Sequence, residues 1–274
     1  CPFLFKVLDV DSMLSIQVHP SKEAAEYGYA QENEKGIPIT ASHRNFKDDN
    51  HKPEIMVALG EFWLLHGFLS KELLLKRLTQ TPELSYLLPV FLDEGYYGLY
   101  KTVMEQSQED TNIHLKPLIE KIILKYYAGE IEKNSPDYWA AKATVTLQQD
   151  DNIDKGIYSI YFFNILKINE GEAIFQDAGV PHAYLEGQNI ELMSNSDNVL
   201  RGGLTKKHID VPELLKHIIF EETRPKIIKG NLQEDQLESI YKTSVEDFEL
   251  SKIEIKSSKP YISKAQSIEI LIVL

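Results

Sequence analysis

The sequence predicts a mainly β protein in which one β-barrel is interrupted by a helical insertion and followed by the start of a second β unit. Two blocks, residues 3–68 and 160–185, carry short runs of β-branched and aromatic residues that are typical of strands. Between them, leucines recur at helical spacing. β-rich blocks on both sides of a helical one indicate a single barrel whose chain leaves to form helices and then returns.

The first β block is predicted to contain two pairs of strands. Residues 3–19 are expected to form a hairpin around Asp11-Ser12. Residues 54–68 are expected to form two more strands that turn near Gly60. Runs of this length are the usual building units of a barrel wall.

A helical subdomain is predicted from residue 70 to residue 150. Leucines between residues 73 and 78 fall at helical spacing. Residues 81–82 place a threonine N-cap directly before a proline at the first helical position. A second cap and proline, at residues 135–136, predict a helix that runs to about Gln149.

The β pattern returns from Ile160. We expect a strand through Ile168, a turn at residues 170–171, and short strands at residues 173–175 and 183–185. These strands would complete the barrel begun by the first β block.

Helical spacing reappears after Asp210, and strands are predicted again from Phe248 to Leu274. The final apolar run, residues 268–274, is predicted to be the middle of a strand, so we expect an excerpt of a longer protein that lacks residues at both ends. The predicted division is a first part of the barrel domain at 1–69, the helical subdomain at 70–150, a second part of the barrel at 151–225, and a truncated β lobe at 226–274.

Composition excludes several classes of function. The chain has 274 residues, of which 43% are hydrophobic and 26% charged, an ordinary globular balance. No apolar stretch approaches the length of a membrane span, and a net charge of −13 makes nucleic acid and anionic membranes poor partners. One cysteine permits no intrachain disulfide and fits a reducing cytoplasm, where we expect a monomer. A small anionic substrate would need a local group of cations, and the candidates are Arg201, Lys206, Lys207 and His208.

Three separated segments supply candidate metal ligands. Gln17 and His19 stand two apart on a predicted strand, so both side chains can point at one spot inside a barrel. Glu54 stands at the mouth of a buried apolar run, where a carboxylate needs a partner that a metal can provide. His182 follows a glycine-containing loop. The helical insertion has one histidine, His114, and is expected to contribute no ligand.

Six ordered blocks resemble the signature segments of the type I mannose-6-phosphate isomerases, a zinc-dependent family of the cupin superfamily. They are residues 14–20 (LSIQVHP), 45–48 (NFKD), 50–54 (NHKPE), 171–173 (GEA), 181–185 (PHAYL) and 196–201 (SDNVLR), and the last block continues through Gly203 to Lys207. The resemblance extends to about residue 222 and implies a cupin, or jelly-roll, barrel with the start of a second cupin lobe.

The resemblance implies one zinc ion per chain, held by Gln17, His19, Glu54 and His182. Two neutral imidazoles, one carboxylate and one amide would leave the site with a single formal positive charge and room for water or substrate, which is typical of a catalytic zinc. The other histidines are expected to be non-ligands: His43, His51, His66, His114, His208 and His217.

The implied reaction interconverts mannose 6-phosphate and fructose 6-phosphate through an enediol, so the partner is a small sugar phosphate. Arg201 is implied at the active site, where a guanidinium can donate hydrogen bonds to developing negative charge. The proton could be moved by Glu191, by Lys52 or by a zinc-bound water. The candidates for binding the substrate phosphate are Ser15, Lys207 and Arg201, and Tyr184 is the candidate for lining the pocket.

Two other functions remain open on the sequence. A cupin of the iron dioxygenase class would use histidines and a carboxylate with a redox metal, whereas the amide of Gln17 suits a redox-inert Lewis acid better. A non-catalytic sugar-binding cupin would keep the fold and lose the chemistry. Retention of all four candidate ligands and of Arg201 argues against that loss.

Overall fold

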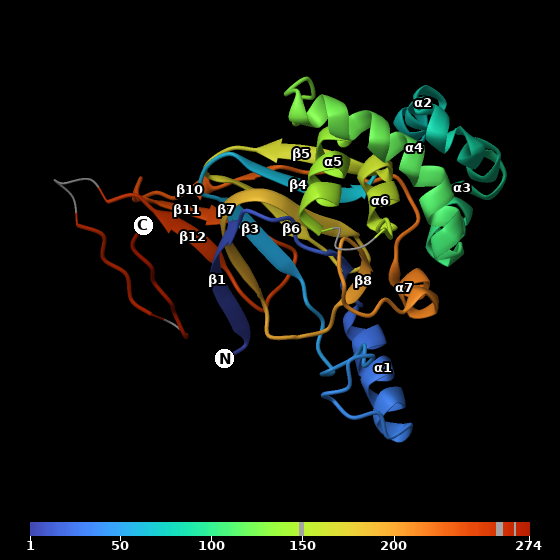
Figure 1. Cartoon of the computed structure of the whole chain (residues 1–274). Coiled ribbons are helices and arrows are strands. Elements are labelled where there is room, and N and C mark those ends of the chain that lie inside the picture. The colour runs from blue at the N-terminus through green and yellow to red at the C-terminus, as the bar shows by residue number, and fades with distance from the viewer. Residues whose placement is uncertain (148–150, 256–259, 266) are drawn as a thin grey trace.

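The fold is described from a computed structural model, which describes residues 1–147, 151–255, 260–265 and 267–274 (Figure 1). The strands are β1 (Phe3–Val10), β2 (Ile16–Val18), β3 (Glu54–Ala58), β4 (Phe62–Phe68), β5 (Phe163–Ile168), β6 (Glu172–Gln176), β7 (His182–Ser194), β8 (Leu200–Gly203), β9 (Ile228–Lys229), β10 (Asn231–Leu232), β11 (Glu238–Tyr241) and β12 (Leu250–Ile253). The helices are α1 (Lys22–Glu34), α2 (Lys71–Gln80), the 3-10 helix η1 (Pro82–Leu87), α3 (Leu88–Glu105), α4 (Gln108–Tyr127), α5 (Pro136–Leu147), α6 (Gly156–Phe162) and α7 (Val211–His217). Within these ranges, no helix combines the length and the apolar character that a membrane crossing requires.

The long strand β7 organises the main sheet, whose strand order is β5-β4-β7-β3-β6-β9. The first half of β7 pairs antiparallel with β2 and β4, and its second half pairs antiparallel with β1 and β3. The two halves meet at Gly187, whose φ of 124° is open to glycine but not to other residues. The sheet therefore curls around an interior instead of lying flat.

Period-two alternation sorts the side chains of these strands between the interior and two outer faces. On β3, Ile55 and Val57 face outward toward β11 and β12, while Met56 faces the interior. On β4, Leu65 faces outward toward the helices, while Leu64 faces the interior. The residues that alternate with outward apolar ones are thus turned into the barrel, and this places the site described below.

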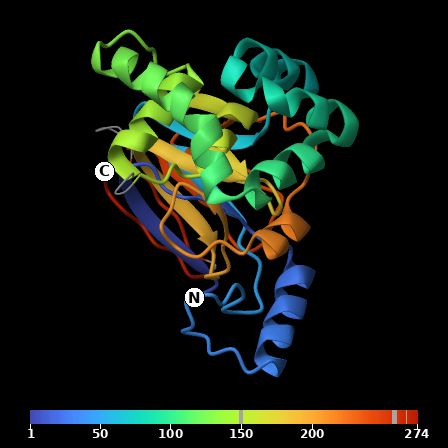
Figure 2. The ribbon, with the colours of Figure 1, turned by 45° about the vertical axis from the view of Figure 1, so that its right-hand side comes forward.

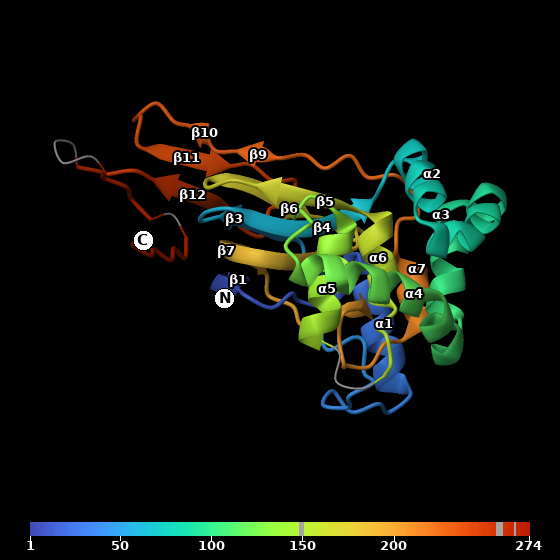
Figure 3. The same ribbon diagram turned by 45° about the horizontal axis from the view of Figure 1, so that its top comes forward.

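The helices cover one outer face of the barrel and share its core. One cluster of buried apolar residues joins Leu65 of β4, Leu118 of α4 and Trp139 of α5. Helices α2 to α6 lie together at one end of the sheet, whereas α1 stands apart from them (Figures 1 and 2). The separate sheet of β10 to β12 lies at the opposite end (Figure 3), where Tyr241 and Phe248 pack against the outer face of β3.

The structure confirms the mainly β class and the helical character of the insertion. Ser70 caps α2 by accepting a hydrogen bond from the backbone N–H of Leu73, and Pro82 begins a helix as predicted, although that helix is η1. Helix α5 begins at Pro136, as predicted. Its predicted end near Gln149 lies outside the described residues.

The predicted hairpin over residues 3–19 is wrong, although both of its strands exist. Strand β1 pairs with the second half of β7, and β2 pairs with the first half of β7 and with β8. Each strand finds its partner more than a hundred residues away along the chain, and local strand patterns carry no information about such partners.

The prediction that β structure returns at Ile160 is wrong by three residues, because α6 continues to Phe162. All seven residues of α6 are buried, and a helix that is buried on every side shows no amphipathic period. Its apolar run therefore resembles a strand in the sequence.

The predicted strand over residues 268–274 is also wrong. The described residues after β12 form no strand, and the side chains of Leu271 and Val273 are 76% and 96% exposed. An isolated extended segment has no neighbour to complete its backbone hydrogen bonds, so β propensity alone does not make it a strand.

Gly156 of α6 and Gly203 of β8 approach each other closely, since a Cβ atom added to Gly203 would lie 2.4 Å from Cα of Gly156. This contact fixes the loop that follows β8. A Cβ atom added to Gly156 would lie 2.5 Å from the backbone N of Leu204 and 2.9 Å from Asp154 Oδ1, and Asp154 Oδ1 accepts the backbone N–H groups of Gly156 and Leu204 at 2.6 and 2.8 Å. We expect Gly156→Ala to lower the free energy of unfolding by about 1–3 kcal/mol, the usual cost of overpacking against groups that cannot move aside. Denaturant unfolding of the full-length protein measures this.

The matched control for that substitution is Gly60→Ala. An added Cβ at Gly60 has no heavy atom within 4 Å, so its unfolding free energy should change by less than about 0.5 kcal/mol. Equal denaturant midpoints of unfolding for the Gly156→Ala and Gly60→Ala proteins would show that the loop after β8 can move aside for an added methyl group.

Candidate metal centre

Strand β2 turns Gln17 and His19 toward the barrel interior. Ile16 and Val18 alternate with them and face outward into the core shared with the helices. Gln17 stands directly opposite His182 of β7 and is half-buried, and His19 follows the last residue of β2 with no exposed surface. Because directly paired residues share a face of the sheet, the pairing brings residues 17, 19 and 182 to one region.

Glu54 lies at the centre of this region, as the first residue of β3. Its Oε1 atom is 3.3 Å from Nε2 of His19, and its Oε2 atom is 3.4 Å from Nε2 of His182. The possible ligand atoms of these three buried residues all lie within 4.8 Å of one another. Lys52 approaches from the preceding loop, with its Nζ atom 2.9 Å from Glu54 Oε1.

Backbone carbonyls orient both imidazoles toward Glu54. Nδ1 of His19 lies 2.9 Å from the carbonyl oxygen of Asn198, and Nδ1 of His182 lies 2.9 Å from that of Val180. A carbonyl oxygen can only accept, so Nδ1 is the donor in each ring, and in the neutral form of the ring Nε2 presents a lone pair. Neither Nε2 atom nor Oε2 of Glu54 has a hydrogen-bond partner among the described residues.

The arrangement of these atoms fits a metal ion. Lone pairs of His19 and His182 face carboxylate oxygens at 3.3 and 3.4 Å, which is unfavourable unless a cation lies between them. Zinc ligands with bonds of about 2.0–2.1 Å occupy tetrahedral corners roughly 3.4 Å apart. The observed separations are therefore those of neighbouring corners of one coordination shell.

The protonation states also suit metal binding. Burial lowers the pKa of His19, although the negative charge of Glu54 opposes this shift. Burial alone would raise the pKa of Glu54, but the neighbouring His19 and the ammonium of Lys52 outweigh it and hold that pKa well below its ordinary value. The lowered pKa values of His19 and Glu54 favour a neutral imidazole and an ionised carboxylate, the forms in which these groups bind metals.

Arg201 of β8 lies next to this cluster, opposite Gln17 in the pairing of β8 with β2. Its Nε atom is buried and has no hydrogen-bond partner in the described part of the chain, and no ion pair to its guanidinium is found there. Burial lowers the pKa of Arg201. Ser15, just before β2, is half-buried, whereas Lys207 is exposed in the turn after β8.

Tyr184 and Glu191 come from β7, the strand that carries His182. Tyr184 is buried in the interior cluster, with its ring centroid 5.3 Å from that of Phe62. Glu191 is 4% exposed, and its Oε2 atom lies 3.8 Å from Nζ of Lys6. Burial, together with the negative charge of Glu54, raises the pKa of Glu191 to about 7.

None of the six histidines predicted to be non-ligands belongs to the cluster of His19, Glu54 and His182. His66 pairs with His182 in the sheet, but its Nδ1 atom is 2.7 Å from Oε1 of Gln176. Sequence reasoning gave no role to Asn198, whose carbonyl orients His19. The only signal was its position inside a block shared with the resembling family, beside Arg201.

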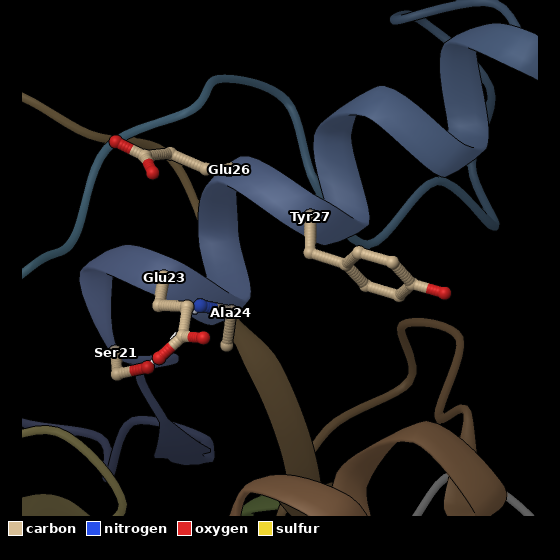
Figure 4. Close-up of a pocket in the computed structure, with 5 residues that line it drawn as sticks. All are labelled: Ser21, Glu23, Ala24, Glu26 and Tyr27. Atoms are coloured by element: carbon tan, nitrogen blue, oxygen red, sulfur yellow. Dashed lines mark hydrogen bonds between the residues drawn. The ribbon is translucent and has the colours of Figure 1, made fainter.

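A surface hollow beside helix α1 lies outside the cluster. Figure 4 shows Glu26 and Tyr27 projecting to different sides of the helix in this region. The hollow is lined by Ser21, Glu23, Ala24, Glu26 and Tyr27. None of these five residues is a histidine or a cation, so the hollow offers no imidazole to a metal and no positive charge to a phosphate. The barrel interior, which holds His19, Glu54 and His182, is therefore the better candidate site.

Comparisons with known proteins agree with this geometry. Residues 1–71 match the family model of the phosphomannose isomerase type I catalytic domain. Mannose-6-phosphate isomerase of Escherichia coli (strain K12) is 35% identical over 274 residues, which cover 98% of this chain and 67% of that protein. The Homo sapiens enzyme is 35% identical over 274 residues, which cover 94% of this chain and 62% of that protein.

Solved structures give the same result. A crystal structure of mannose 6-phosphate isomerase from Salmonella typhimurium, bound to its substrate and to zinc, matches with a TM-score of 0.79 and 34% identity. The match covers 91% of this chain and 62% of that one. The chain therefore spans 62–67% of the length of these three relatives. The predicted cupin fold is thereby confirmed. Taken together, the length and identity of these matches show that the chain belongs to the type I mannose-6-phosphate isomerase family.

Proposed function

We propose that this chain is the catalytic part of a zinc-dependent isomerase that interconverts mannose 6-phosphate and fructose 6-phosphate through an enediol. The observation that carries the proposal is the set of unpartnered atoms on His19, Glu54 and His182, whose separations from one another fit a single coordination shell. The zinc and substrate of the Salmonella typhimurium structure support the same identity for the ligands here.

Gln17, His19, Glu54 and His182 would together hold one zinc ion. Gln17 is assigned because it faces His182 across the sheet and lies on the same side of β2 as His19. When bound, the ion supplies a Lewis acid that polarises the carbonyl oxygen of the sugar. Oxygen and nitrogen ligands suit zinc, and the absence of thiolates leaves the site electrophilic.

Arg201 would stabilise the negative charge that develops on the sugar oxygens as the proton moves between C1 and C2. Its guanidinium borders the cluster and has no acidic partner among the described residues, so its donors are available to substrate. Arg201, with Ser15 and Lys207, is also our candidate group for binding the phosphate. Tyr184 would line the interior beside the sugar.

For the proton transfer we favour Glu191 or a water molecule over Lys52. Nζ of Lys52 is already paired with Oε1 of Glu54 at 2.9 Å, so that carboxylate holds it in place beside the proposed ligands. Glu191 lies in the same interior and has a pKa of about 7, so it can both accept and return a proton near neutral pH.

A coupled assay of the full-length protein tests the proposal. We expect conversion of mannose 6-phosphate to fructose 6-phosphate, about one zinc per chain by atomic emission, and loss of activity on treatment with a chelator that returns when zinc is added. Iron in place of zinc, with oxygen consumption, would instead identify a dioxygenase. Sugar binding without turnover would identify a non-catalytic cupin.

The remaining expectations concern the whole protein. We propose a monomer of the cytoplasm, in which residues 226–274 begin a second cupin lobe after the barrel and its helical subdomain. Sedimentation of the full-length protein would test the oligomeric state, and limited proteolysis would test the domain boundaries.

A further inference from the structure

We propose that Asn198 is a positioning residue of the metal centre, which holds His19 and the loop leading to Glu54 in one fixed arrangement. Asn198 lies between Ser194, where β7 ends, and Leu200, where β8 begins, and it has no exposed surface. Its side chain bonds to backbone groups of a neighbouring loop and to Oδ1 of Asp48, and not to the proposed ligands. The inference rests on the metal centre of the proposed function and is independent of which sugar phosphate the protein uses.

The side chain of Asn198 is bound on all sides by a single loop. Its Oδ1 atom accepts the backbone N–H groups of Lys47 and Asp48 at 2.7 and 3.3 Å. Its Nδ2 group donates to the backbone carbonyls of Asp48 and Asn50 at 2.8 and 2.9 Å. A buried amide with both its donors and its acceptor satisfied fixes its neighbours closely, because any displacement leaves a polar group unpaired.

The backbone of Asn198 performs a second task. Its carbonyl oxygen lies 2.9 Å from Nδ1 of His19 and so sets both the tautomer and the direction of that ring. The loop held by the side chain runs on through Lys52 and the rigid Pro53 to Glu54. Asn198 thus connects His19, at the end of β2, with the loop that leads to Glu54. Both of the residues positioned in this way are proposed ligands.

Asp48, in the loop bound by Asn198, also binds the segment that contains Asn198. The Oδ1 atom of Asp48 accepts from Oγ of Ser196 at 2.7 Å, and the Oδ2 atom of Asp48 accepts from the backbone N–H of Asp197 at 2.8 Å. Each loop therefore uses a side chain to bind the backbone of the other. This reciprocal arrangement gives a physical role to the 45–48, 50–54 and 196–201 blocks beyond their ligand and arginine.

Asn198→Asp tests the role with almost no change in shape. The new carboxylate oxygen would face the carbonyls of Asp48 and Asn50, which now accept from Nδ2, and would repel both. In the full-length protein, we expect zinc affinity, measured by competition with a chromogenic chelator, to fall by about 10–100-fold, as when an outer partner of a metal-bound histidine is lost. With cobalt(II) in place of zinc, the visible absorption spectrum should also change, since it reports ligand geometry.

The matched control is Asn195→Asp, the same change in the same loop. Asn195 is exposed, and its side chain donates to the carbonyl of Cys1. Zinc affinity should stay within about twofold of the parent protein, as expected for an exposed substitution. A folded Asn198→Asp protein with parental zinc affinity, whether or not its melting temperature falls, would overturn the proposal and leave Asn198 a role in stability alone.

Ser196→Ala decides the matter if Asn198→Asp does not fold. It removes a hydroxyl that donates to Asp48 and to the carbonyl of Asn50 and that accepts the backbone N–H of Asn198. We expect zinc affinity to fall by about two- to tenfold, the range expected when hydrogen bonds that hold the two loops together are lost. Unchanged affinity in that variant would overturn the proposal. Because these readouts measure zinc and not turnover, a protein that showed them without isomerase activity would refute the proposed function and leave this inference standing.

Discussion

Replacing His182 by alanine is expected to lower zinc affinity by more than about 100-fold and to reduce isomerase activity to background. Outer hydrogen-bond partners of a ligand are themselves worth about 10–100-fold, so loss of a ligand should exceed that range. The substitution removes one of the two imidazoles that face Glu54, whose Oε2 atom lies 3.4 Å from His182. Zinc per chain by atomic emission and the coupled assay measure the two effects.

His66→Ala is the matched control for that experiment. His66 stands opposite His182 in the sheet and is also buried, but it lies outside the cluster and its ring contacts Gln176. The variant should retain its zinc even if its stability falls. If His66→Ala lost its zinc and His182→Ala kept it, His66 and not His182 would belong to the ligand set.

Arg201→Ala is expected to lower kcat by about 100-fold or more while zinc content stays near that of the parent protein. Arg201 is no metal ligand in our proposal, and charge for its guanidinium to stabilise appears only as the enediolate forms. Removing a donor to a developing oxyanion typically costs about 10²–10³-fold in kcat, because the interaction is stronger in the transition state than with bound substrate.

Steady-state kinetics of the full-length protein with mannose 6-phosphate provide the measurement. Arg224→Ala is a suitable control, since this side chain is 89% exposed and pairs with Glu222 at 2.9 Å. If Arg201→Ala raised KM and left kcat unchanged, Arg201 would only grip the phosphate, and its catalytic role would have to be dropped.

Much of the fold follows from local patterns. Leucine spacing and proline after a capping residue predict the helices of the insertion, because those signals act within one or two turns. The spacing of two on β2 predicts that Gln17 and His19 face the same side. Local patterns fail at β1 and β2, whose partner is β7, and at α6, where complete burial removes the amphipathic period.

The candidate site, like the fold, could be predicted from the sequence only in part. Gln17 and His19 can be placed together from their spacing alone, but joining them to Glu54 and His182 required the resemblance to a family. The sequence could not show that Nε2 of each histidine is unpartnered or that the carbonyls of Asn198 and Val180 hold the rings. Those facts depend on backbone atoms, which are the same in every residue and leave no mark in composition or spacing.

The central place of β7 has a consequence for how the protein is made. Strands β1, β2, β3 and β4 all lie early in the chain, and each pairs with β7, so that Phe3 meets Ser194. During synthesis these strands must wait, without their main partner, until residues 182–194 have left the ribosome. Pairing over such separations is slow because a long loop must close first. The last proposed ligand arrives on that same strand, so a nascent chain could capture its metal only once the barrel is able to close, and the moment of zinc uptake would mark the completion of the barrel.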